Sequence, residues 1–171
     1  MINLTVDTFR QRFPHIGSAL EFDEIAALLP LLKIQIVEAS EALIVEGTET
    51  DALYFVWEGE LDVVMQSPQG EYKVARVEQG ALLGEISLLS PGKTTATVRS
   101  ELGCIALHLD RPSLEIFWED HPHAASVFLN ELSRFVAQRI RSANEIVKSL
   151  RQAQSYDSET LKSAQQELME G

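Results

Sequence analysis

Residues 80–98, GALLGEISLLSPGKTTATV, contain the side chains of this sequence that could bind a small anion. Gly84 can adopt a backbone conformation that other residues resist, and it lets a ligand approach the chain closely. Residues 85–89 could then form one short helical turn whose free backbone N–H groups point at a bound anion. Glu85 could accept a hydrogen bond from a hydroxyl group of the ligand, and the polar turn at 90–95 would close the site from the other side. This stretch therefore predicts a ligand-binding segment.

The elements that must position this segment are short apolar runs separated by glycine turns. Such runs fill residues 34–109, and Gly47, Gly59 and Gly70 separate several of them. Short strands that recur about every ten residues are typical of an antiparallel sandwich or barrel, such as a jelly roll. The sequence thus predicts a mainly β fold in which the helical turn at 85–89 interrupts the strands.

Helical patterns flank the strands on both sides. Residues 22–32 place apolar side chains on one helical face. After the strands, Asp110 is a good N-cap with Pro112 in the first turn of a helix, and Pro122 begins a second helix. These patterns predict three segments: an N-terminal helical segment at 1–33, a β-barrel with the ligand segment at 34–121, and a C-terminal helix with its tail at 122–171.

The second C-terminal helix carries an apolar stripe whose members are separated by alternating steps of four and three residues. Such steps are typical of the seam of a two-stranded coiled coil. The stripe consists of Val136, Ile140, Ala143, Val147 and Leu150. The next steps reach the polar Gln154 and Asp157, so we expect the helix to end near residues 155–158 and a freshly capped helix to follow.

In their order and spacing, these segments resemble the cyclic nucleotide-binding domain family, in particular the effector domain of catabolite activator protein-like regulators. GEISLL at 84–89 is similar to the start of the family's phosphate-binding cassette, and ATV at 96–98 to the strand that follows it. The similarity runs from about residue 22 to about residue 150. It implies a double-stranded β-helix (jelly-roll) barrel with N-terminal helices and a long C-terminal helix, which in the family often pairs with its copy in a dimer.

The resemblance also implies which residues would contact a cyclic nucleotide. Glu85 is similar to the family acid that accepts a hydrogen bond from the ribose 2′-hydroxyl group. The amides of Ile86 and Ser87 would face the phosphate oxygens, and Thr95 would add an amide and a hydroxyl group. A threonine at the position of Thr95 contacts guanine in relatives that prefer cyclic GMP, which makes cyclic GMP a slightly better candidate than chance alone would. The implied ligand-binding set is Gly84, Glu85, Ile86, Ser87, Lys93, Thr94 and Thr95.

The chain departs from the family at the arginine that clamps the cyclic phosphate, because Thr94 fills that position. A charge-assisted hydrogen bond contributes about 1.5–3 kcal/mol, so its loss should weaken binding roughly ten- to a hundredfold. The neighbouring Lys93 could place a point charge on the phosphate, although it lacks the planar fork of arginine. Two interpretations of Lys93 stay open, a partial substitute for the arginine and a solvated loop lysine.

Composition narrows the class of partner. The 171 residues include 26 acidic and 14 basic side chains, and the net charge of -12 repels nucleic acids and anionic membrane surfaces. We therefore expect no nucleic-acid or membrane partner. The single cysteine, Cys104, rules out a disulfide within the chain and lies in an apolar run, where we expect an inert core thiol. The sequence shows no signal-peptide pattern, so we expect a cytoplasmic protein.

Catalytic and metal-binding patterns are missing from the sequence. His121 and His123 flank Pro122, and no cysteine or acidic cluster supports them as metal ligands. Nothing resembles a catalytic triad, a Walker loop or a dinucleotide fingerprint, so we expect neither an enzyme nor a bound cofactor.

The sequence predicts a non-catalytic regulatory module that binds cyclic AMP or cyclic GMP weakly and signals to a protein partner in trans. Two alternatives stay open. One is a degenerate domain that no longer binds nucleotide and acts as a homodimeric interaction module. The other is a truncated transcription regulator, which would need a basic domain beyond residue 171.

Overall fold

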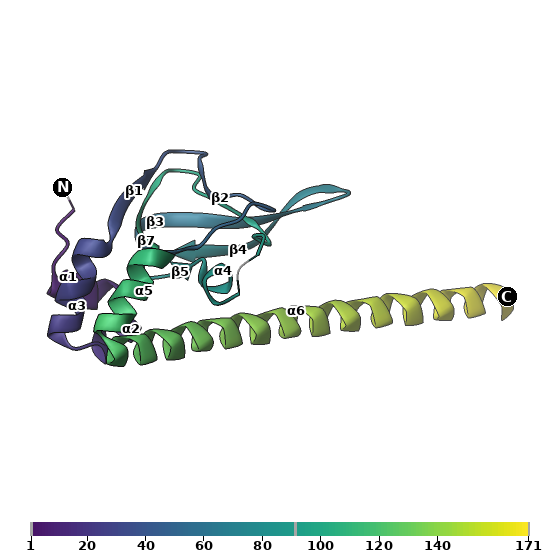
Figure 1. Cartoon of the computed structure of the whole chain (residues 1–171). Coiled ribbons are helices and arrows are strands. Elements are labelled where there is room, and N and C mark those ends of the chain that lie inside the picture. Colours follow the sequence, from purple (N-terminus) through teal and green to yellow (C-terminus); the bar gives the residue numbers. More distant parts are fainter. Residues whose placement is uncertain (1, 91, 171) are drawn as a thin grey trace. The chain divides into compact units, whose positions relative to one another are not determined.

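The strands form one antiparallel, seven-stranded sheet that curls around an apolar interior (Figure 1). The structure, a computed structural model, describes the backbone of residues 2–90 and 92–170 and the side chains of residues 2–90 and 92–149. The strands are β1 (Lys33–Val37), β2 (Ala42–Ile44), β3 (Ala52–Ser67), β4 (Gly70–Glu78), β5 (Leu82–Leu83), β6 (Thr97–Arg99) and β7 (Cys104–Asp110). Their order is β1-β7-β3-β6-β2, and β4 and β5 also pair with β3. The expected jelly-roll class of the cyclic nucleotide-binding type is confirmed.

Strand β3 holds the two halves of the sheet together. Its first half pairs with β7 and β5, and its second half pairs with β4 and β6. The change occurs next to a bulge between Val56 and Glu58, where Gly59 has φ +89°. A side chain at Gly59 would lie 2.9 Å from the carbonyl oxygen of Gly103, so glycine lets the two strands approach closely.

The interior of the barrel is filled by aliphatic side chains from most of the strands. Buried members of this cluster include Val37, Leu43, Ile44, Val56, Leu61, Leu83, Val98 and Ala106. Cys104 belongs to the same cluster, which agrees with the expected core thiol.

Helices precede and follow the barrel. They are α1 (Val6–Arg12), α2 (Pro14–Ala19), α3 (Phe22–Leu28) and the 3-10 turn η1 (Leu29–Leu31) before it, and α5 (Arg111–Asp120) and α6 (Pro122–Glu170) after it. The expected helix at 22–32 is shorter than predicted: α3 ends at Leu28, and Pro30 lies inside η1. Proline removes a backbone donor and is poorly tolerated inside an α-helix, which accounts for the early end.

A chain of aromatic rings packs these helices against the outer face of β3. Phe55 of β3 lies 5.7 Å from Phe9, 5.2 Å from Phe13 and 6.4 Å from Phe128, measured between ring centroids. Phe128 in turn lies 6.2 Å from Phe117 of α5. All five rings are buried. This cluster joins α1, α5 and the start of α6 to the barrel.

Helix α6 starts at Pro122 as predicted, but the predicted helix end at 155–158 is wrong. The helix is continuous as Pro122–Glu170. No glycine or proline lies between residues 123 and 170, and serine, tyrosine and aspartate lower helix propensity by less than about 1 kcal/mol each. The local polar pattern is therefore too weak to end the helix.

The chain divides into two compact units, Met1–Leu132 and Ser133–Gly171. Within the described residues, every helix is too short or too polar to span a membrane.

Candidate functional site

Residues 80–98, called the cassette below, contain the expected helical turn, α4 (Glu85–Leu89). Gly84 precedes it at the N-cap with φ +85°, in the left-handed region that favours glycine. A side chain at Gly84 would also lie 2.2 Å from the carbonyl oxygen of Ala52 in β3. Glycine is thus required both by the backbone conformation and by the close approach of β3.

The side chains of α4 divide between a buried face and an exposed face. Glu85 is 1% exposed and Ser87 is 7% exposed, whereas Ile86 and Leu89 are 46% and 42% exposed. A carboxylate this deeply buried needs polar partners, because water no longer stabilises its charge. The structure therefore places the side chain of Glu85 on the barrel side of the cassette and the side chain of Ile86 on the solvent side.

Thr94, which stands where the family has its arginine, is bonded to the turn that follows β2. Its hydroxyl group donates to the carbonyl oxygens of Val45 (2.5 Å) and Thr48 (3.1 Å). Its backbone N–H also donates to the carbonyl oxygen of Thr48 (2.8 Å), and its carbonyl oxygen accepts from the N–H of Gly47 (2.9 Å). Thr94 is thus a structural link between two loops.

Lys93 and Thr95, on either side of Thr94, are both exposed. Lys93 forms an isolated antiparallel bridge with Glu49. Residues 93–95 therefore run alongside residues 45–49. Pro91, which belongs to the predicted polar turn, lies outside the described residues.

A hollow of about 430 Å³ lies beside the cassette and is lined by Glu49, Thr50, Asp51 and Gly92. Within the part of the chain that the structure describes, none of the seven predicted site residues is in its lining. Both ionisable residues of the lining are acidic, which disfavours an anionic phosphate at that wall of the hollow. The seven predicted residues divide between α4, with its N-cap Gly84, and the loop at 93–95.

Arg111 is a residue of this region that sequence reasoning missed. Its guanidinium Nη2 donates to the carbonyl oxygens of Ser87 (3.0 Å) and Leu88 (2.6 Å), in the last turn of α4. The backbone N–H of Arg111 donates to the carbonyl oxygen of Asp51 (3.0 Å). The only signal for it in the sequence was its position directly after the predicted N-cap, Asp110.

Asp110 itself caps α5 as predicted. Its carboxylate accepts from the N–H of Ser113 (2.9 Å) and pairs with Nζ of Lys33 (2.5 Å). The hydrogen bonds from Lys33 and Ser113 hold the pKa of the Asp110 carboxyl well below its usual range. The start of α5 is therefore fixed by β1 as well as by its own backbone.

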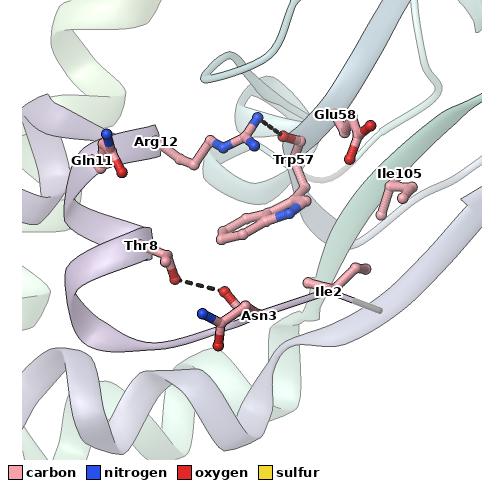
Figure 2. Close-up of a pocket in the computed structure, with 8 residues that line it drawn as sticks. All are labelled: Ile2, Asn3, Thr8, Gln11, Arg12, Trp57, Glu58 and Ile105. Atoms are coloured by element: carbon pink, nitrogen blue, oxygen red, sulfur yellow. Dashed lines mark hydrogen bonds between the residues drawn. The ribbon is translucent and has the colours of Figure 1, made fainter.

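A second hollow, of about 280 Å³, lies between α1 and the strands (Figure 2). Arg12 crosses one side of it: its guanidinium lies 5.2 Å from the centre of the Trp57 ring and donates to the carbonyl oxygen of Trp57 and to Oε1 of Gln79. Trp57 is 4% exposed, so its ring is part of the packed interior. This hollow is separate from the cassette and shares no lining residue with the first one.

The cysteine and two of the histidines are buried or paired with other side chains. Burial raises the pKa of the Cys104 thiol to about 11, and burial lowers the pKa of His108. Nδ1 of His123 lies 2.9 Å from Oε1 of Glu24, so this histidine ties α6 to α3. Among the described residues no three His, Cys, Asp or Glu side chains gather as metal ligands would.

The family model described as "Cyclic nucleotide-binding domain" matches residues 34–134. Among curated proteins, Glutaminase 1 of Bradyrhizobium diazoefficiens is 28% identical over 125 residues, which make up 73% of this chain and 20% of the glutaminase. The chain therefore spans about a fifth of the length of that relative.

Three of the solved structures that are similar to this chain illustrate the fold that they share with it. The N-terminal domain of a transcriptional regulator from Streptomyces coelicolor A3(2) is 31% identical, with a TM-score of 0.62 over 76% of this chain and 88% of that domain. A cyclic nucleotide-binding domain from Methylobacillus flagellatus is 21% identical, with a TM-score of 0.73 over 80% of each chain.

A third structure is the regulatory subunit of a cAMP-independent protein kinase A from Trypanosoma brucei. It is 22% identical, with a TM-score of 0.61 over 79% of this chain and 51% of that subunit. The crystallised form carries glutamate-to-alanine, threonine-to-arginine and valine-to-alanine substitutions and is bound to cAMP in the A site. The family model covers more than half of this sequence, and on that match the chain belongs to the cyclic nucleotide-binding domain family.

Proposed function

We propose that this chain is a non-catalytic regulatory module that binds a cyclic nucleotide weakly and signals to a protein partner in trans. The observation that carries the proposal is the geometry of the cassette. Gly84 is held at φ +85°, α4 follows it directly, and Glu85 faces the barrel in a domain of the cyclic nucleotide-binding family. The ligand would contact the set implied by the sequence, namely Gly84, Glu85, Ile86, Ser87, Lys93, Thr94 and Thr95.

Weak binding follows from the state of Thr94. Its hydroxyl group is already bonded to the carbonyl oxygens of Val45 and Thr48. Its side chain is short and neutral, so it cannot supply the fork of charged donors that an arginine presents to a phosphate. The exposed Lys93 can add a point charge only.

The subunit from Trypanosoma brucei supports the same interpretation by analogy. It is described as cAMP-independent, and the form bound to cAMP carries a threonine-to-arginine substitution among its three changes. For the present chain we propose that an arginine at Thr94 raises the affinity for cyclic AMP and cyclic GMP.

A second candidate function is a degenerate domain that binds no nucleotide and serves as a homodimeric interaction module. The lining of the hollow beside the cassette favours it, because Glu49 and Asp51 would repel a phosphate. The four hydrogen bonds of Thr94 to residues 45–48 favour it as well, since they give the loop a structural role.

In either case we propose that a homodimer forms through α6. The stripe Val136, Ile140, Ala143 and Val147 lies along one side of this helix, and Ile140 and Val147 are 56% and 50% exposed in the single chain. The fifth member of the stripe, Leu150, has a side chain outside the described residues.

Titration calorimetry of the natural chain and of Thr94→Arg with cyclic AMP and cyclic GMP tests the ligand. We expect dissociation constants in the micromolar range or weaker for the natural chain, and binding roughly ten- to a hundredfold tighter for Thr94→Arg. Thr50→Arg is the matched control, because it adds the same charge to the lining of the neighbouring hollow and not at the position of the family's arginine. Nanomolar affinity in the natural chain would contradict the argument from Thr94, and no binding by either protein would support the degenerate domain.

A further inference from the structure

Arg111 joins the cassette to the first helix after the barrel. The last carbonyl groups of a helix have no partner within it, and a cation near them is favourable. At the end of α4, the guanidinium of Arg111 occupies this position with bonds to Ser87 and Leu88. Because Arg111 is the first residue of α5, the end of α4 and the start of α5 are bonded directly to each other.

The other end of the cassette leads back to the same residue. Thr94 is bonded to Val45, Gly47 and Thr48, and this loop continues to Asp51, whose carbonyl oxygen accepts from the N–H of Arg111. A closed ring results: the cassette is bonded to the loop at 45–51, the loop is bonded to Arg111, and Arg111 is bonded back to the cassette at α4. Two sides of this ring, the loop at 45–51 and the cassette at Gly92, contribute the lining of the 430 Å³ hollow.

We propose that Arg111 is a positioning residue that clasps the cassette to α5, so that α4 and the first turn of α5 shift as one unit. The inference deepens the proposed function, since it names the route by which occupancy of the cassette reaches the helices. The start of α5 is fixed to β1 through Asp110 and Lys33. A displacement of α4 must therefore either carry α5 with it or break the two bonds of Arg111.

Hydrogen exchange measured by mass spectrometry on the full chain tests the clasp without any ligand. The variant is Arg111→Gln, which removes the charge and the fork of donors. Arg10→Gln is a matched control, because Arg10 also donates two bonds to carbonyl oxygens, those of Gly17 and Leu20, but lies among the N-terminal helices.

In Arg111→Gln we expect amide exchange to rise roughly tenfold or more in two segments together, α4 with Ser90 and the first turns of α5. In Arg10→Gln we expect the rise only around residues 13–20. Arg111→Lys keeps the charge with a single donor group, so exchange in both segments should fall between that of the natural chain and that of Arg111→Gln.

Faster exchange in α4 with no change in α5 would overturn the clasp. A uniform rise over the whole barrel in both Arg111 variants would overturn it too, because that result indicates general destabilisation. If Arg111→Gln does not fold, the comparison of Arg111→Lys with the natural chain gives the same decision. Since no nucleotide is added, failure of the ligand proposal in calorimetry leaves this result unaffected.

Discussion

At the scale of single residues, Gly84 is the position where the barrel and the cassette constrain the chain most tightly. Its φ of +85° and the nearby carbonyl oxygen of Ala52 both disfavour a side chain. Gly47 provides a natural comparison, because its φ is +78° and a side chain there would meet nothing within 4 Å. The two glycines thus separate backbone strain from steric clash.

We predict that Gly47→Ala lowers the free energy of unfolding by about 1–2 kcal/mol, the cost of a left-handed conformation for a residue with a side chain. Gly84→Ala should lose this amount and, in addition, about 1–3 kcal/mol because the new methyl group overlaps the backbone of β3. Urea denaturation followed by circular dichroism measures both. Equal losses in the two variants would show that β3 yields to the methyl group at no cost.

The residues of the cassette illustrate what sequence can and cannot predict about a site. The glycine, the acid and the helical turn were predicted, because Gly84 and Glu85 act through their own backbone and immediate neighbours. The bonds of Thr94 could not be predicted, since their acceptors Val45 and Thr48 lie 49 and 46 residues earlier. Arg111 was missed for the same reason, because its acceptors on α4 lie 24 and 23 residues away.

At the scale of elements, the boundary between β7 and α5 connects the first C-terminal helix to the barrel. Asp110 ends β7, caps α5 and pairs with Lys33 of β1. Sequence reasoning found the cap because an N-cap acts on residues two or three positions away. It could not find Lys33, which reaches Asp110 only because β1 pairs with β7.

The depressed pKa of Asp110 makes this boundary sensitive to acid. A carboxyl whose folded pKa lies below its unfolded value of 3.8 contributes stability above that pH, and the contribution is lost as the pH falls toward the folded pKa. The substitution Asp110→Asn would still leave a capped helix, since asparagine and aspartate are equally good N-caps. It therefore removes the charge and keeps the cap.

We predict that Asp110→Asn is less stable than the natural chain by about 1 kcal/mol or less at pH 7, because Lys33 is largely exposed. The difference should shrink as the pH falls from 5 to 3. Thermal unfolding of both proteins at pH 7, 5 and 3 measures it. Asp120→Asn, at the other end of α5, is the control for loss of one negative charge. A difference that grows toward pH 3 would mean that Asp110 is not stabilised in its ionised form.

At the scale of the whole molecule, charge is distributed unevenly along the sequence. Residues 1–132 contain 21 of the 26 acidic side chains and 8 of the 14 basic ones, whereas residues 133–149 contain four basic residues and one acidic residue. Three of the basic residues, Arg134, Arg141 and Lys148, are seven positions apart and so lie along one side of α6. Because a helix turns by about 100° per residue, this side is well away from the stripe of Val136, Ile140, Ala143 and Val147. The helix pair that we propose would leave these charges in solvent, where they do not oppose association.

The proposed dimer leads to the last prediction, which concerns Val147→Asp. A carboxylate at Val147 would meet its copy in the seam of the helix pair, away from water and without a partner charge, so we expect the variant to be a monomer. Ser149→Asp adds the same charge to the polar side of α6 and should leave the natural state of association unchanged. Sedimentation velocity at micromolar concentration distinguishes the two results. A natural chain that sediments as a monomer, or a Val147→Asp variant that stays a dimer, would remove the stripe as the interface, because burial of its apolar side chains is the only driving force assigned to it.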